Sequence, residues 1–93
     1  MPSLPTTRHE TRSIERWVID RVAFYLECPV DDVDPAVPLA ETGIDSASAV
    51  GLCGEVEDHW QIDADATLVF DYPTIADITA FIAEKVAHMK RAA

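Results

Sequence analysis

The sequence predicts an all-α domain in which amphipathic helices pack as a bundle. Three stretches repeat apolar residues at three- and four-residue steps, which is the period of one helix face. Connections with several Pro and acidic residues separate these stretches, and proline in particular favours turns and loops over helix. The chain has 93 residues, enough for one domain with a small core and little room for a deep enzyme cleft.

The first helix is predicted to begin near Thr11 or Ser13 and to end at about Glu27. Pro29 sets this end, because the residue before a proline avoids the helical region. The apolar stripe that faces the core consists of Ile14, Trp17, Val18, Val22, Tyr25 and Leu26. Residues 1–10 contain two prolines and little apolar character, so we expect a flexible leader ahead of the helix.

Residues 30–43 are predicted to form a long loop, which contains Pro35, Pro38 and a run of acids. A long ordered loop in a small domain needs anchors within the fold. We expect four apolar side chains to press onto the bundle: Val33, Val37, Leu39 and Ile44.

The second helix is predicted from about Ser46 to His59 or Trp60. Asp45 is placed to cap it, because a carboxylate at this position accepts an unpaired backbone N–H. One stripe should face inward, made of Ala49, Leu52, Cys53, Val56 and Trp60.

A neighbouring, more exposed face of this helix holds Ala47, Val50, Gly51 and Gly54. A glycine in a helix interior costs about 1 kcal/mol relative to alanine. Either the close approach of another backbone or a partner compensates for this cost, or the helix is poorly optimised, and the sequence leaves both possibilities open.

Residues 67–70 are short and apolar, so periodicity cannot distinguish a strand from a helical turn here. After Pro73, Thr74 is placed to cap the last helix, and Asp77 completes an approximate capping box. The apolar stripe of this helix consists of Ile75, Ile78, Ile82, Val86 and Met89.

Charge is distributed unevenly along the chain. All seven Lys and Arg lie outside residues 22–84, which hold fourteen of the seventeen Asp and Glu. An acidic surface repels nucleic acid and anionic membranes and attracts basic protein surfaces, so we expect protein partners only.

Two cysteines make no disulfide framework, and residues 1–7 do not look like a signal peptide, so we expect a cytoplasmic chain with reduced thiols.

Catalytic and metal-binding chemistry are not predicted. A hydrolase would need a base to activate Ser46, and His9, His59 and His88 are not placed by sequence to serve as one. Cys53 and His59 are six residues apart, which places them on different helix faces, and no close-set pair of metal ligands occurs.

The start of the second helix carries the most specific motif, Gly43-Ile44-Asp45-Ser46. The Ser46 hydroxyl lies beside the positive end of the helix dipole, where unpaired N–H groups suit an attached phosphate. The segment Phe70-Asp71-Tyr72-Pro73-Thr74 follows, and then one amphipathic helix. From about Thr11 to Met89 the chain resembles the acyl carrier protein family, in which the Ser of a Gly-x-Asp-Ser motif carries 4′-phosphopantetheine.

This resemblance implies a function. A phosphopantetheinyl transferase would attach 4′-phosphopantetheine to Ser46, with Asp45 as a member of the motif and the helix cap. The group would hold acyl or polyketide intermediates as thioesters for the enzymes of a polyketide or fatty-acid synthase, and the chain itself would catalyse nothing. The resemblance also makes residues 67–70 a short third helix. The predicted fold is then an acyl-carrier-like four-helix bundle with a long loop between its first two helices.

The same resemblance divides the chain and suggests partners. Residues 11–89 would form the carrier domain, between the leader 1–10 and a C-terminal tail 90–93. Besides the transferase, a ketosynthase, an acyltransferase or acyl-activating enzymes would bind the monomeric protein. Helix spacing and the resemblance together place the partner-binding face at Ala47, Val50, Gly51, Gly54, Glu55 and Asp58. Family members commonly have Leu or Ile after the modified Ser, so Ala47 leaves the identity of the partner open.

Three further alternatives follow from the sequence. Ile62, Leu68, Phe70 and Ile75 line an acyl pocket or pack as ordinary core, and ordinary packing is favoured. A peptidyl carrier protein of non-ribosomal peptide synthesis usually has His before the modified Ser, whereas this chain has Asp45. An unmodified acidic helical adaptor would explain the charge and the bundle, but not the two motifs at family spacing.

Overall fold

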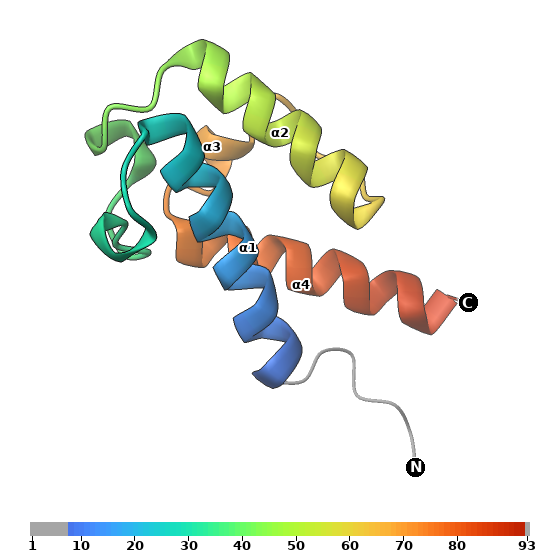
Figure 1. Ribbon diagram of the computed structural model, residues 1–93. Helices are drawn as coiled ribbons and strands as arrows, with labels where there is room; N and C mark the ends of the chain where they lie inside the picture. The colour runs from blue at the N-terminus through green and yellow to red at the C-terminus, as the bar shows by residue number, and fades with distance from the viewer. Residues whose placement is uncertain (1–7, 93) are drawn as a thin grey trace.

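The computed structural model describes residues 8–92 and is mainly helical (Figure 1). Four α-helices follow one another: α1 (Arg8–Leu26), α2 (Ser46–Trp60), the short α3 (Leu68–Asp71) and α4 (Ile75–Ala92). The predicted all-α fold is therefore confirmed, including the short third helix that periodicity alone could not assign.

Two helix boundaries differ from the prediction. The first helix begins at Arg8, ahead of Thr11 and Ser13, and α4 continues through the predicted tail to Ala92. The two extended helix ends contact each other, because Lys90 Nζ lies 2.5 Å from Glu10 Oε2. Glu10 also suits the positive end of the α1 dipole. The rest of the predicted leader, residues 1–7, lies outside the described part of the chain.

The core lies between α1, α2 and α4, with α1 packed extensively on α4 (Figure 1). Ile78 and Ile82 of α4 and Val18 and Val22 of α1 are fully buried. The helix stripes predicted for α1, α2 and α4 therefore lie inward, except that Met89 is 43% exposed near the end of α4. Burying an aliphatic side chain contributes about 1.5–3 kcal/mol, so these stripes account for most of the helix packing.

The connection between α1 and α2 is ordered by turns and by bonds to the start of α4. It contains two 3₁₀ turns, Val30–Asp32 and Leu39–Glu41. The N–H of Leu39 donates to the Pro73 carbonyl at 2.7 Å, and the N–H of Ala76 donates to the Pro35 carbonyl at 3.1 Å. These bonds fix the loop that leads into α2.

The predicted anchors of this loop differ in depth. Leu39 is 1% exposed and is the main anchor, while Val33 and Ile44 are half-buried against the core. Val37 is half-buried but does not belong to the core cluster or pack against it, so its prediction as an anchor is wrong. The hydrogen bonds to Pro73 and from Ala76 hold the loop where a further apolar contact was expected.

Candidate functional site

The chain reverses sharply before α2 and presents Ser46 as the first residue of the helix. Gly43 has φ +97°, a left-handed conformation that glycine adopts without strain. Asp45 is extended and caps the helix, with Oδ1 accepting a hydrogen bond from the Ser48 N–H at 2.7 Å. This hydrogen bond holds the pKa of the Asp45 carboxyl below its usual value. The predicted N-cap is confirmed.

The surroundings of Ser46 fit an attached phosphate group. Ser46 is exposed, whereas Ser48 one residue beyond Ala47 is half-buried. The first N–H groups of a helix have no carbonyl partner within it, and the Asp45 carboxylate takes the one from Ser48. The N–H groups of Ser46 and Ala47 therefore remain beside the Ser46 hydroxyl, at the positive end of the α2 dipole.

The histidine on α2 lies far from Ser46. The ring of His59 stacks on Trp17 with centroids 4.7 Å apart, and the edge of Trp60 meets it at 4.8 Å. His59 comes thirteen positions after Ser46 on the same helix, which corresponds to about 20 Å along the helix axis. His59 is therefore part of an aromatic cluster between α1 and α2, and it is not a base for the Ser46 hydroxyl.

The predicted partner face is only partly free. Ala47, Gly54 and Asp58 are exposed, and Val50 is 56% exposed. Gly51, in contrast, lies under the phenol of Tyr25: a Cβ added to Gly51 would be 2.7 Å from Tyr25 Oη. The two helix glycines therefore differ, because Gly51 accommodates a side chain of α1 while a Cβ on Gly54 would meet nothing within 4 Å.

Glu55 is held by two residues of α1. Arg21 Nε lies 2.5 Å from Glu55 Oε1, and Tyr25 Oη donates a hydrogen bond to Glu55 Oε2. The hydrogen bond to Glu55 raises the pKa of the Tyr25 phenol. No local pattern indicated these contacts, because Tyr25 fits the apolar stripe of its helix and Arg21 is 34 residues from Glu55.

The four residues predicted to line an acyl pocket differ in burial. Ile62, Leu68 and Ile75 are buried in the core cluster. Phe70 is 73% exposed, so it cannot line an interior pocket and its inward assignment is wrong. A short helix of one turn has room for only a few inward positions, and Leu68 and Val69 fill them in α3.

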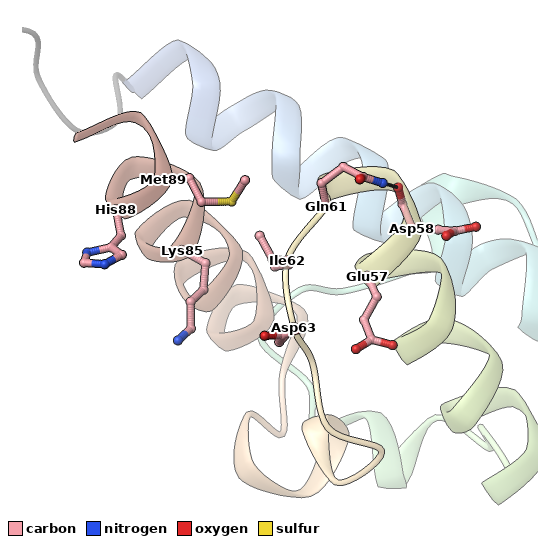
Figure 2. Close-up of a pocket in the computed structure, with 8 residues that line it drawn as sticks. All are labelled: Glu57, Asp58, Gln61, Ile62, Asp63, Lys85, His88 and Met89. Atoms are coloured by element: carbon pink, nitrogen blue, oxygen red, sulfur yellow. Dashed lines mark hydrogen bonds between the residues drawn. The ribbon is translucent and has the colours of Figure 1, made fainter. Parts of the chain in front are cut away.

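A groove of about 580 Å³ opens at the other end of α2 (Figure 2). Its sides come from the end of α2, the connection that follows and the last turns of α4. The lining residues are Glu57, Asp58, Gln61, Ile62, Asp63, Lys85, His88 and Met89. Ser46 is not among them, so the groove is separate from the start of α2.

Two further properties concern the described residues, 8–92. No three side chains of His, Cys, Asp or Glu come together there in a way that could bind a metal ion. None of the helices in this range combines the length and apolar character needed to cross a membrane.

The two cysteines differ in burial. Cys53 is buried, as predicted, and its burial raises the pKa of the thiol, while Cys28 is half-buried.

Comparison with known proteins gives a family match and several relatives. Residues 16–82 match the family described as "Phosphopantetheine attachment site". One of the subunits of the phenolphthiocerol/phthiocerol polyketide synthase of Mycobacterium tuberculosis is 32% identical over 79 residues, which are 84% of this chain and 4% of that protein. Polyketide synthase PksR of Bacillus subtilis is 33% identical over 72 residues, 77% of this chain and 3% of that protein. The chain thus spans a small part of these relatives.

Two solved structures share the fold. The HMG-ACPI domain from the CurA module of Lyngbya majuscula has a TM-score of 0.81 at 18% identity, covering 97% of this chain and 89% of that domain. A free-standing peptidyl carrier protein from Acinetobacter baumannii has a TM-score of 0.79 at 24% identity, covering 82% of this chain and 95% of that protein. At these identities the likeness concerns the arrangement of the helices alone.

Proposed function

The chain belongs to the phosphopantetheine attachment family, and we propose that Ser46 is the residue that carries its 4′-phosphopantetheine. The observation that carries this proposal is the exposed Ser46 hydroxyl at the start of a helix that Asp45 caps. When attached, the group supplies a terminal thiol that holds an acyl chain as a thioester. The protein is a carrier and not a catalyst, since it contributes attachment and presentation.

The residues around Ser46 have distinct roles in this proposal. The N–H groups of Ser46 and Ala47 would face the phosphate. Asp45 would keep its carboxylate turned to the Ser48 N–H, which limits repulsion between two anions at the same helix end. Gly43 allows the turn that brings the hydroxyl to the surface.

We assign the carrier to polyketide synthesis. The relatives from Mycobacterium tuberculosis and Bacillus subtilis are polyketide synthases, which supports a polyketide intermediate as the cargo over a fatty-acyl chain. A peptidyl carrier protein is the second candidate, since one such protein shares the fold. Asp45 before the serine favours the acyl carrier.

The partners in this proposal are a phosphopantetheinyl transferase, a ketosynthase, an acyltransferase or acyl-activating enzymes. They would bind a cytoplasmic monomer on the exposed part of α2, at Ala47, Val50, Gly54 and Asp58. Val50 supports this assignment, because it is a large apolar side chain, 56% exposed, one helical turn from Ser46. We leave Gly51 and Glu55 out of this proposed face. Tyr25 lies over Gly51, and both Tyr25 and Arg21 bind the Glu55 carboxylate.

Intact-mass measurement tests the proposal. The protein is incubated with coenzyme A, Mg²⁺ and a broad-specificity phosphopantetheinyl transferase, beside the variants Ser46→Ala and Ser48→Ala. We expect one added phosphopantetheine in the wild type and in Ser48→Ala, and none in Ser46→Ala. Ser48→Ala is the matched control, because it removes the neighbouring hydroxyl on the same helix turn. If well-folded wild type gains no mass with two different transferases, the unmodified adaptor is the better explanation.

A further inference from the structure

A cluster of polar contacts joins α1 to α2 on the side of α2 next to the exposed face. We call Arg21, Tyr25, Gly51 and Glu55 the Tyr25 clasp. Both oxygens of the Glu55 carboxylate are engaged, Oε1 by Arg21 Nε at 2.5 Å and Oε2 by the Tyr25 hydroxyl. The side chains of Arg21 and Glu55 are 25% and 33% exposed, so the pair lies at the edge of the helix interface.

The clasp constrains both the distance and the rotation of α2. Gly51 precedes Glu55 by four residues, so both lie on the same helix face. The Tyr25 phenol lies across this face because Gly51 has no Cβ. A Cβ on residue 51 would be 2.7 Å from Tyr25 Oη, 3.3 Å from Cζ and 3.4 Å from Cε1. At 2.7 Å the two atoms would clash, so either the phenol or the helix would have to move.

The α1 side of the clasp is braced by a third residue, which is aromatic. The guanidinium of Arg21 lies 4.5 Å from the centre of the Phe24 ring, and the Phe24 and Tyr25 rings meet edge to face at 5.4 Å. Such contacts restrict the rotamers of both donors. Glu55 therefore meets two donors whose positions are already limited before it binds.

The position of the clasp relative to Ser46 gives it a role. The α1 helix packs extensively on α4 and much less on α2, so directed bonds have a larger share in orienting α2. We propose that Tyr25, Arg21 and Glu55 are positioning residues, which fix the rotation of α2 on α1 and so the direction in which Ser46 is presented to partner enzymes. This inference rests on the proposed role of Ser46. It removes Glu55 from the contacts made by those partners.

The alternative role for Glu55 is a direct contact with a basic partner surface. The two roles make opposite predictions for Arg21→Gln. If Glu55 is a contact, removing Arg21 frees its carboxylate, and partner binding becomes stronger and more dependent on salt. If Glu55 is a positioning residue, Arg21→Gln and Glu55→Gln disturb the same clasp, and both impair presentation.

The test measures kcat and KM for loading by a broad-specificity phosphopantetheinyl transferase with coenzyme A, for the full chain. Far-UV circular dichroism first fixes a temperature at which every variant is fully folded. We expect Arg21→Gln and Glu55→Gln to lower kcat by a similar factor, roughly tenfold, because small misplacements of a reacting group have large effects on rate. KM and its salt dependence should change little, since partner contacts are retained. Arg16→Gln and Glu84→Gln are matched controls, because both side chains are exposed and lie outside the clasp.

A double substitution tests the geometry independently. Gly51→Ala alone should lower kcat, because its methyl group displaces the Tyr25 hydroxyl. Tyr25→Phe removes that hydroxyl, so adding Gly51→Ala to Tyr25→Phe should cause little further loss. A role of Gly51 in partner contact would instead make the two losses independent.

Three results would overturn the inference. The first is an increase or no change in kcat/KM for Arg21→Gln while Glu55→Gln lowers it. The second is no effect of either variant, and the third is independent losses in the Tyr25→Phe/Gly51→Ala pair. If the folded wild type accepts no phosphopantetheine, both the proposed function and the positioning role fail. If the wild type is loaded normally and the variants give one of the three results above, only the positioning role fails.

Discussion

Helix α1 meets its two large neighbours in different ways. It packs extensively on α4, and Val18, Val22, Ile78 and Ile82 of the two helices are fully buried members of one apolar core. Its contact with α2 includes the Tyr25 clasp and the stacked rings of Trp17 and His59, which lie nearer the surface. Apolar packing gives stability without direction, and polar contacts give direction at modest gain. We therefore expect packing of α1 on α4 to contribute more to stability than the clasp, and the clasp to orient the helix that starts with Ser46.

Substitution in the α1–α4 interface should have the greatest consequence. Ile78→Ala should reduce the free energy of unfolding by about 2–5 kcal/mol, because it removes buried methyl groups and leaves a cavity. Urea denaturation followed by circular dichroism measures this change. Phe70→Ala is the control, since Phe70 is 73% exposed and a surface substitution should change stability by less than about 0.5 kcal/mol. Equal losses for the two variants would contradict the placement of the core.

A smaller change should result from breaking the clasp. Glu55→Gln should cost about 1 kcal/mol of unfolding free energy, because partly exposed ion pairs and hydrogen bonds contribute little. Urea denaturation again gives the value, and the Trp17 side of the interface should keep the helices in contact. A loss as large as that for Ile78→Ala would mean that the clasp carries the fold, and the contrast between the two interfaces would not hold.

One polar group in the α4 core should respond in the opposite direction. The Thr79 side chain is 3% exposed and its Oγ1 is buried without a hydrogen-bond partner within residues 8–92. Thr79→Val removes this group with little change in shape, so we expect a gain of up to about 1 kcal/mol. A higher midpoint in urea would confirm that the buried site of Thr79 favours an apolar side chain. A loss would show that the hydroxyl has a partner that the packing does not reveal.

The smallest expected change in stability is the pH dependence that the clasp confers. The hydrogen bond from Tyr25 to Glu55 raises the pKa of the Tyr25 phenol above the ordinary value of 10.0. The stabilisation is therefore complete at pH values below 10.0 and is lost as the pH rises through the higher pKa of the folded protein. The stability difference between wild type and Tyr25→Phe should shrink in this alkaline range. A difference that stays constant across it would show that the phenol does not donate to Glu55.

Local features of the sequence predicted the Ser46 region well. Gly43, Asp45 and Ser46 specify a turn, a cap and a first helical residue through interactions that span only a few residues, so the start of α2 and its cap could be predicted. The apolar stripes likewise identified the inward faces of the long helices. Short α3 could be assigned only through resemblance, because four residues are too few to show a period.

Contacts between distant residues explain what the sequence could not predict. Glu55 meets Tyr25 and Arg21 across 30 and 34 residues, and Lys90 meets Glu10 across 80, so neither the clasp nor the extended helix ends follow from local pattern. The exposure of Phe70 has the same origin, because it depends on how a single helical turn is oriented against the bundle. The prediction of the partner face could not include these contacts, in which Tyr25 lies over Gly51 and both Tyr25 and Arg21 bind Glu55.

The role of Ser46 as the attachment residue is best tested by locating the added mass within the loaded protein. No Lys or Arg lies between Val22 and Glu84, so trypsin would leave Ser46 and Ser48 in one long peptide. Cleavage beside the acidic residues Asp45 and Glu55 gives a short peptide that contains both serines. Fragmentation of this peptide by electron transfer then distinguishes Ser46 from Ser48. We predict that the phosphopantetheine is found on Ser46 alone. Its location on Ser48 or on any other residue would contradict this assignment.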